Sequence, residues 1–289
     1  MIHEPQFPSA ARWAFARARR QYIELLRRAG YDCQMQFDMA GWVDWRRAQG
    51  GQTTYSFDPE YNRLSPANSF WIAARYIGSD PVRQRDTLDG LAAVGACRLF
   101  ETGDLVELVA SGRLWFREAT ARRTELAPGL PLIGGRVGHH GGLFVRQAHR
   151  RQGLPVALSR LARFSIAERW APDWDSGLLT QDPPPGRDMV RKYGFGWDLP
   201  LVRGWSAARR GPAAVNLLLL NRAGLIDQAR RDAVLVDLYD GGDPRDALAA
   251  IVERTEEPDI ALRPSGQHTV DAGKDGLAAL GAGHEAVGV

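Results

Sequence analysis

The fold is decided by the stretch GGLFVRQAHRRQGLPVALSRLARF, residues 141–164. An apolar strand enters a turn that holds several arginines and a glycine, and the turn opens an amphipathic helix. The first backbone N–H groups of a helix have no internal partner and carry partial positive charge, and glycine lets a ligand approach the backbone closely. The turn therefore predicts a pyrophosphate-binding site.

Candidate ligands for this pyrophosphate, and for the chain attached to it, come from the strand end and the turn. They are Leu143, Phe144, Val145, Arg146, Arg150, Arg151, Gln152, Gly153 and Leu154. The same residues would also make a basic helix start exposed to water. The apolar strand that precedes the turn, and a Gly194-Phe195 pair further along the chain, favour the binding site.

Two short motifs in this region resemble the acyl-CoA-binding core of the GNAT superfamily of N-acetyltransferases. That family has Arg/Gln-x-x-Gly-x-Gly/Ala between a strand and a helix, and here the sequence is RRQGLP, residues 150–155. Pro155 departs from the pattern and removes one backbone donor, although proline is tolerated in a helix's first turn. The stretch MVRKYGF, residues 189–195, is similar to the family's Tyr-x-x-x-Gly-Phe, with Val190 at the usual tyrosine. The resemblance covers about residues 67–200.

The resemblance implies an α/β (α+β) fold: a mixed, mostly antiparallel sheet flanked by helices and splayed near Val145, so that the coenzyme lies between two strands. It implies acetyl-CoA or another acyl-CoA as co-substrate, with direct transfer to an amine on a small molecule or a protein. Acyl-homoserine-lactone synthases share this fold and resemble residues 70–102. A third alternative, favoured by Val190 and Pro155, is a non-catalytic acyl-CoA-binding or interaction module.

Acyl transfer to an amine needs a base that takes the amine proton, and the leaving thiolate gains from an acid. His139 and His140 lie on the strand before the turn, where alternation points one of them at the acceptor. Glu101 and Glu107 follow the preceding strand, and Tyr193 is the tyrosine of the second motif. Each also has a structural interpretation, as a strand histidine satisfied by its neighbours, a surface carboxylate or a core aromatic.

Composition is that of a globular protein: 289 residues, 44% apolar, 25% charged and a net charge of +3. All but Lys192 and Lys274 of the 37 basic residues are arginine, a skew that does not by itself favour nucleic acid. Cys33 and Cys97 are expected as buried thiols. We expect no metal site, no leader, no membrane span and a cytoplasmic location. The acceptor and the oligomeric state are left open.

Periodicity divides the chain into four expected parts. They are an N-terminal helix with an aromatic acceptor-side segment (1–66), an acyl-CoA-binding core (67–205), a C-terminal strand with helices (206–259) and a disordered tail (260–289). Expected helices are 10–29, a short one near Trp42, 187–193, 223–232 and 244–255, and expected strands are 69–77, 91–100, 137–145, 178–180 and 214–220. We expect loop over most of 34–64, a helix or extended connection at 104–110 and another short element at 112–118. The first helix should present a solvated arginine face.

Overall fold

The computed structural model describes residues 6–50, 54–87, 90–179, 187–238 and 242–254. The tail expected at residues 260–289 lies outside the described residues. Within them one sheet runs in the order β1-β2-β3-β4-β5-β7-β6. The strands are β1 (Tyr31–Gln36), β2 (Ser69–Tyr76), β3 (Leu91–Thr102), β4 (Gly135–Val145), β5 (Trp174–Leu179), β6 (Trp197–Ser206) and β7 (Gly211–Asn221). All neighbours pair antiparallel except β4 and β5, which confirms the expected mixed, mostly antiparallel sheet.

The sheet opens between its two parallel strands. β4 and β5 pair only from Val137↔Trp174 to His139↔Ser176. Beyond that point β4 continues along β3 and β5 continues along β7, so the two halves of the sheet diverge. The expected splay near Val145 therefore begins earlier, after His139. A bulge in β4 lies beside the opening, between the pairs Ala96↔Gly141 and Val94↔Phe144.

The bulge depends on a glycine. Gly142 has a φ of +57°, a conformation that L side chains rarely adopt. A Cβ at this position would also overlap the ring of Trp42. A bulge leaves its extra residue outside the ladder and bends the strand, so the β3–β4 ladder is interrupted beside the opening.

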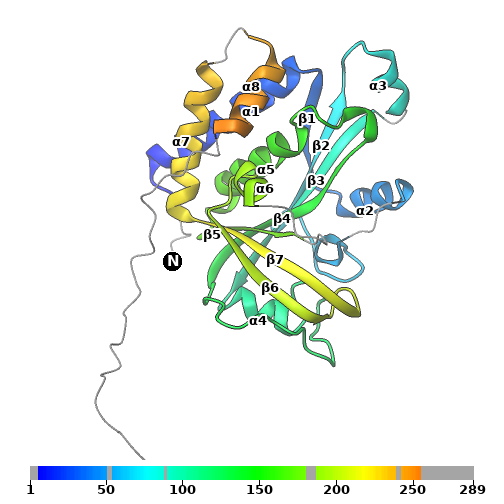
Figure 1. Cartoon of the computed structure of the whole chain (residues 1–289), viewed down its shortest axis with the longest axis vertical. Coiled ribbons are helices and arrows are strands. Elements are labelled where there is room, and N and C mark those ends of the chain that lie inside the picture. The colour runs from blue at the N-terminus through cyan, green and yellow to red at the C-terminus, as the bar shows by residue number, and fades with distance from the viewer. Residues whose placement is uncertain (1–5, 51–53, 88–89, 180–186, 239–241, 255–289) are drawn as a thin grey trace, which may run out of the picture. The chain divides into compact units, whose positions relative to one another are not determined.

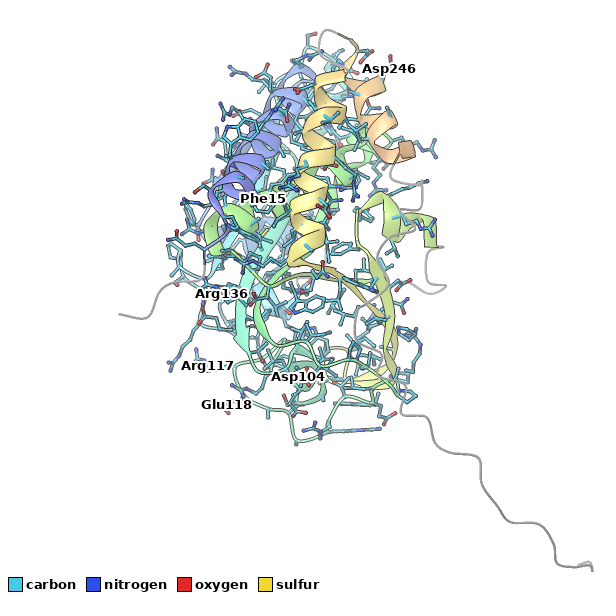
Figure 2. All side chains as sticks on the ribbon, turned by 90° about the vertical axis from the view of Figure 1, so that its left-hand side faces the viewer. Phe15, Asp104, Arg117, Glu118, Arg136 and Asp246 are labelled. Carbon is cyan, nitrogen blue, oxygen red and sulfur yellow. The ribbon has the colours of Figure 1, made fainter. Side chains whose placement is uncertain are left out.

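Helices cover both faces of the sheet (Figure 1). One face carries α1 (Ser9–Arg28), α5 (Leu154–Trp170), α6 (Arg187–Lys192), α7 (Arg222–Leu238) and α8 (Pro244–Arg254). The remaining helical segments are α2 (Met39–Ala48), η1 (Tyr55–Phe57), α3 (Pro81–Asp86), α4 (Leu105–Ala110) and η2 (Gln147–His149). Figure 2 shows Phe15 on α1 and Asp104, the N-cap of α4, below it near the bottom of the view.

Strand alternation divides the core between the two faces. Leu218 and Leu220 of β7 join the α1–α5 core, whereas Leu217 and Leu219 join the core under α4. A third cluster under α2 contains Trp42 and Phe57. Helix α5 is buried nearly all round, because α1 and α7 cover the side that does not touch the sheet. This central helix also begins at the predicted phosphate turn.

Several local predictions require correction. Residues 31–36 form an edge strand where loop was expected from residue 34, residues 197–206 form a second edge strand that was not expected, and 112–118 form no helix or strand. The arginines of α1 are not simply solvated, since Arg17 pairs with Asp237 on α7 and Arg19 with Glu168 on α5. Helix α1 thus belongs to the helical layer, and none of its residues lines the cavity described below.

Candidate functional site

A cavity of about 480 Å³ lies at the opening of the sheet. Its walls come from both faces, so it runs through the gap between β4 and β5. On the α5 face they are Leu158, Ser159, Ala162, Tyr193 and Phe195, and on the opposite face Arg46, Thr54, Tyr55, Phe57, Trp115 and Arg209. Backbone of Gly141, Gly142 and Gly177 lines the passage between them. A ligand entering from α5 can therefore meet a second one from the other face.

His140 lines this cavity and is backed by a buried carboxylate. Its Nε2 lies 3.2 Å from Oδ2 of Asp175, and the same oxygen accepts a hydrogen bond of 2.7 Å from Nε of Arg163. Burial raises the pKa of Asp175, but the charges and hydrogen bonds of His140 and Arg163 outweigh it and leave the pKa below its ordinary value. The ring also stacks on Phe195, 5.3 Å between centroids. A fixed imidazole with a carboxylate behind it is suited to accept a proton.

His139 has a different environment, although it also lines the cavity. It is 2% exposed, stacks on Phe57 and places Nδ1 3.0 Å from Oγ of Ser176. Burial, with the charges of His140 and Arg98, lowers its pKa to about 3. The ring is therefore neutral at physiological pH and a weak proton acceptor. Of the two predicted histidines, His140 has the chemistry of a base.

Glu101 and Glu107 do not reach the cavity, which corrects the expectation that either could act as the base. Glu101 pairs with Arg136 at the far end of the β3–β4 ladder, with an O–N distance of 3.5 Å. Glu107 lies on α4 and accepts two hydrogen bonds from Arg123, which hold its pKa below the ordinary value. Both are exposed carboxylates on the surface.

Tyr193 lines the cavity, and burial raises its pKa, so its hydroxyl is protonated. Val190, at the position where the family motif has tyrosine, is buried in the α1–α5 core. The glycine of the second motif, Gly194, is required by the local structure. It has a φ of +75°, and a Cβ here would overlap the guanidinium of Arg160 and the amide of Gln228.

The phosphate turn leaves backbone donors available. Gly153 is the N-cap of α5 with a φ of +71°, and Arg151 has a φ of +61°. In the described part of the chain, the N–H groups of residues 151–154 donate to no protein acceptor. Two of the predicted coenzyme-binding residues make contacts within the protein instead. Nε of Arg146 donates to the carbonyl of Leu91, and the ring of Phe144 packs against Arg46 and Trp45.

Helix α8 and His149 hold this turn in place. Leu248 of α8 packs closely on Gly153. A Cβ added to Gly153 would lie 2.8 Å from the Cβ of Leu248. The buried ring of His149 accepts or donates a hydrogen bond of 3.1 Å with the hydroxyl of Tyr31 and contacts the ring of Tyr76. Nothing in the sequence pattern singled out His149 for this role.

Sequence reasoning also missed the charged network behind His140. Arg160 and Arg163 are both fully buried in α5. Arg163 binds Asp175, Gln228 and the carbonyl of Tyr193, while Arg160 lies 3.5 Å from Asp232, which also accepts from the hydroxyl of Tyr22. The network ties α1 and α7 to the segment that carries Tyr193 and Phe195. The available signal was a pair of arginines at i, i+3 within an apolar helix.

Among the described residues, no cluster of three or more His, Cys, Asp or Glu side chains could hold a metal ion. Across the same residues, no helix combines the length and apolar character that spanning a membrane would require. Cys33 and Cys97 are free and buried, and burial raises the pKa of Cys33 to about 12.

Solved structures similar to this chain include acetyltransferases of the family that its motifs resemble. NAA60 of Arabidopsis thaliana in complex with acetyl-CoA shares 10% identity, with a TM-score of 0.40 over 66% of this chain and 99% of that one. The same enzyme with a bisubstrate analogue shares 12% identity, with a TM-score of 0.40 over 66% and 97%. A GCN5-related N-acetyltransferase from Brucella melitensis shares 9%, with a TM-score of 0.39 over 76% and 91%.

No family model matches the chain, and no curated protein matches it. At the identities and TM-scores above, likeness to solved structures assigns no activity to this chain.

Proposed function

We propose that the protein is a GNAT-type acyltransferase, which moves an acetyl or other acyl group from acyl-CoA to an acceptor amine by direct transfer. The observation that carries the proposal is the cavity that passes between β4 and β5 and holds His140, backed by Asp175. On the α5 face the cavity reaches Leu158, one helical turn after α5 begins. A coenzyme with its phosphates on the turn can therefore extend its thioester to His140.

The residues present fit an acyl-CoA. Free N–H groups at residues 151–154 supply donors for phosphate oxygens at the start of a long helix. The hydroxyl of Ser159 is buried on the cavity wall and has no partner among the described residues, so it is available to an amide of the pantetheine arm. Pro155 lacks an N–H, which leaves the turn one donor short of the family's usual set.

In the proposed reaction the amine nitrogen attacks the thioester carbonyl carbon, and the C–S bond breaks. His140 takes the amine proton at the ring nitrogen that does not face Asp175, and Asp175 stabilises the imidazolium. Backbone N–H groups at the Gly142 bulge are the candidates to polarise the carbonyl. Tyr193 is the candidate donor of a proton to the leaving thiolate.

Release of coenzyme A from acetyl-CoA and longer acyl-CoAs, measured with a panel of amines, tests the activity. Product mass spectrometry separates the alternatives. A simple N-acyl amine supports the transferase. An acyl-homoserine lactone, formed from an α-amino acid whose γ-carbon bears a leaving group that the carboxylate displaces, supports the synthase-like alternative, and binding without release supports a non-catalytic module. Turnover that persists undiminished in His140→Gln would remove His140 from the mechanism.

Coenzyme binding needs its own variant, because Gly153→Asp would strain a left-handed residue and strike Leu248 whether or not phosphate binds. Gln152→Glu adds a negative charge at the turn with almost no change of shape. We expect it to weaken coenzyme A binding in calorimetry by about 10-fold or more, through repulsion of the phosphates. Gln147→Glu, the same change at an exposed position before the turn, is the control and should shift affinity far less.

A further inference from the structure

The half of the cavity opposite α5 has a distinct chemical character. It is lined by Arg46, Thr54, Tyr55, Phe57, Trp115 and Arg209, here called the acceptor half. If the coenzyme enters along α5, as proposed above, this half remains for the acceptor. Among these residues three are aromatic and two are arginines, and the cavity also contacts Leu178, Ser206, Ala208 and Val215. Among all described residues that line the cavity, none is Asp or Glu.

Two arginines line the acceptor half, and a third lies behind its wall. Arg46 of α2 is 8% exposed, and its guanidinium is held over the ring of Phe144, 4.6 Å from the centroid. Arg209 lies exposed in the turn between β6 and β7. Behind the cavity wall, Arg98 donates to the carbonyl of Ser56 at 2.9 Å and its charge opposes protonation of His139. The charged side chains that line the acceptor half are therefore both positive.

A positive cavity selects among amines. It repels an ammonium ion, so an acceptor that offers only a cation, such as a lysine side chain or a peptide N-terminus, gains nothing from it. For an amine that also carries a carboxylate, binding of the carboxylate offsets this repulsion, because guanidinium groups bind carboxylates in a planar, bidentate geometry. The same field lowers the pKa of the bound amine and favours the neutral nucleophile.

Size and walls narrow the class further. Ligand cavities commonly span roughly 300–1,000 Å³, and this one, at about 480 Å³, must hold the thioester end of the coenzyme as well. A small acceptor is therefore favoured over a folded protein surface. Tyr55, Phe57 and Trp115 offer aromatic faces and edges that suit a flat apolar body.

We propose that the acceptor is a small amine that carries a carboxylate and an apolar, preferably aromatic, body, of which a free aromatic amino acid is the simplest example. Arg46 and Arg209 bind the carboxylate, and the aromatic residues of the acceptor half bind the body. The amine extends through the gap between β4 and β5 toward His140, whose ring stacks on Phe195 on the α5 side. This proposal rests on the proposed function and specifies its acceptor.

Substrate pairs test it on the unaltered protein. Phenylalanine, phenylalaninamide and the dipeptide amide Phe-Ala-NH2 present the same amine and ring, but only the first has a carboxylate next to the amine. We expect kcat/KM for phenylalanine to exceed that for either amide by about 10–100-fold, the loss typical of an absent charged hydrogen bond. Comparable or better turnover of the amides would overturn the proposal.

Variants locate the selectivity. Arg46→Gln and Arg209→Gln should bring the acid and amide rates together, mainly through a higher KM for the acid. Arg209 is exposed, so its variant is expected to fold. An unchanged affinity for coenzyme A shows that both variants are folded. If the acid-to-amide ratio stays at its original value in both variants, the two arginines do not bind the carboxylate and the assignment fails.

A binding measurement separates this proposal from the proposed function. Phenylalanine and phenylalaninamide are titrated into the protein saturated with coenzyme A. Tighter binding of the acid supports the acceptor class whether or not turnover is found. Turnover of amides without preference for acids refutes the acceptor class and leaves the transferase intact. Absence of coenzyme A binding and of turnover with every amine refutes the transferase itself.

Discussion

At the scale of single residues, two adjacent histidines differ because strand alternation points them at different surroundings. His140 lies beside Asp175, which also accepts a hydrogen bond from Arg163, whereas His139 stacks on Phe57 and is 2% exposed. His140→Gln should lower kcat by about 10²–10⁴-fold, the usual contribution of a positioned base, and leave coenzyme A affinity unchanged. His139→Gln is the matched control. Equal losses in the two variants, measured by steady-state kinetics, would contradict the division of roles.

His139 also makes a prediction about stability and pH. Its pKa in the folded protein is about 3, below the 6.5 of an ordinary histidine, because burial disfavours the charged ring. Below pH 6.5 this histidine is protonated in the unfolded chain but stays neutral in the folded chain. The contribution of His139 to the free energy of unfolding is therefore complete above pH 6.5 and is lost as the pH falls. At pH 5 the loss is about 2 kcal/mol. Denaturant unfolding at pH 7 and pH 5 should show a smaller difference in His139→Gln than in the unaltered protein.

At the scale of elements, the segment from α6 into β6 is held by a glycine that touches the buried arginine network. Gly194→Ala combines a left-handed φ with overlap of Arg160 and Gln228, and we expect it to lower the free energy of unfolding by about 3 kcal/mol or more. Gly196→Ala is the control on the other side of Phe195, since its Cβ would meet Leu220 at an ordinary 3.6 Å. Melting temperatures that fall equally in both variants would contradict this account.

The elements differ in how well the sequence predicts them. The strands at 69–76, 91–102 and 135–145 follow from their apolar runs, and α1, α7 and α8 follow from helical periodicity. Strand β1 carried an alternating signal, since Tyr31 and Cys33 face the core, but it is short and adjoins an irregular aromatic segment. Strand β6 contains Pro200, a residue type that disfavours a central strand, and it is tolerated there because β6 is the edge of the sheet.

At the scale of the whole molecule, the candidate site depends on pairings that sequence patterns do not show. The phosphate turn is local, and its glycine and arginines sit next to one another in the chain. Asp175 meets His140 because β4 and β5 pair in parallel, and Arg163 reaches Asp175 from α5. An arginine in a helix is usually exposed, so its charge gives no sign of burial. The aromatic wall of the acceptor half comes from two segments, Tyr55 and Phe57 after α2 and Trp115 after α4, where periodicity carries no information.

The C-terminal helix connects the stability of the molecule to the phosphate turn. Ala247, Leu248 and Ile251 of α8 are buried in the α1–α5 core, and Leu248 packs on Gly153. Truncation after Leu238 removes this cover, and losing the burial of Leu248 and Ile251 alone should cost about 3–6 kcal/mol. It should also weaken coenzyme A binding, because the turn loses the helix that supports it. Truncation after Ser265 keeps α8 and should leave the melting temperature and the affinity unchanged. Calorimetric scans and coenzyme titrations of the two shortened chains, compared with the full chain, test both statements. A stable Leu238 truncation that binds coenzyme A normally would show that α8 does not hold the turn in place.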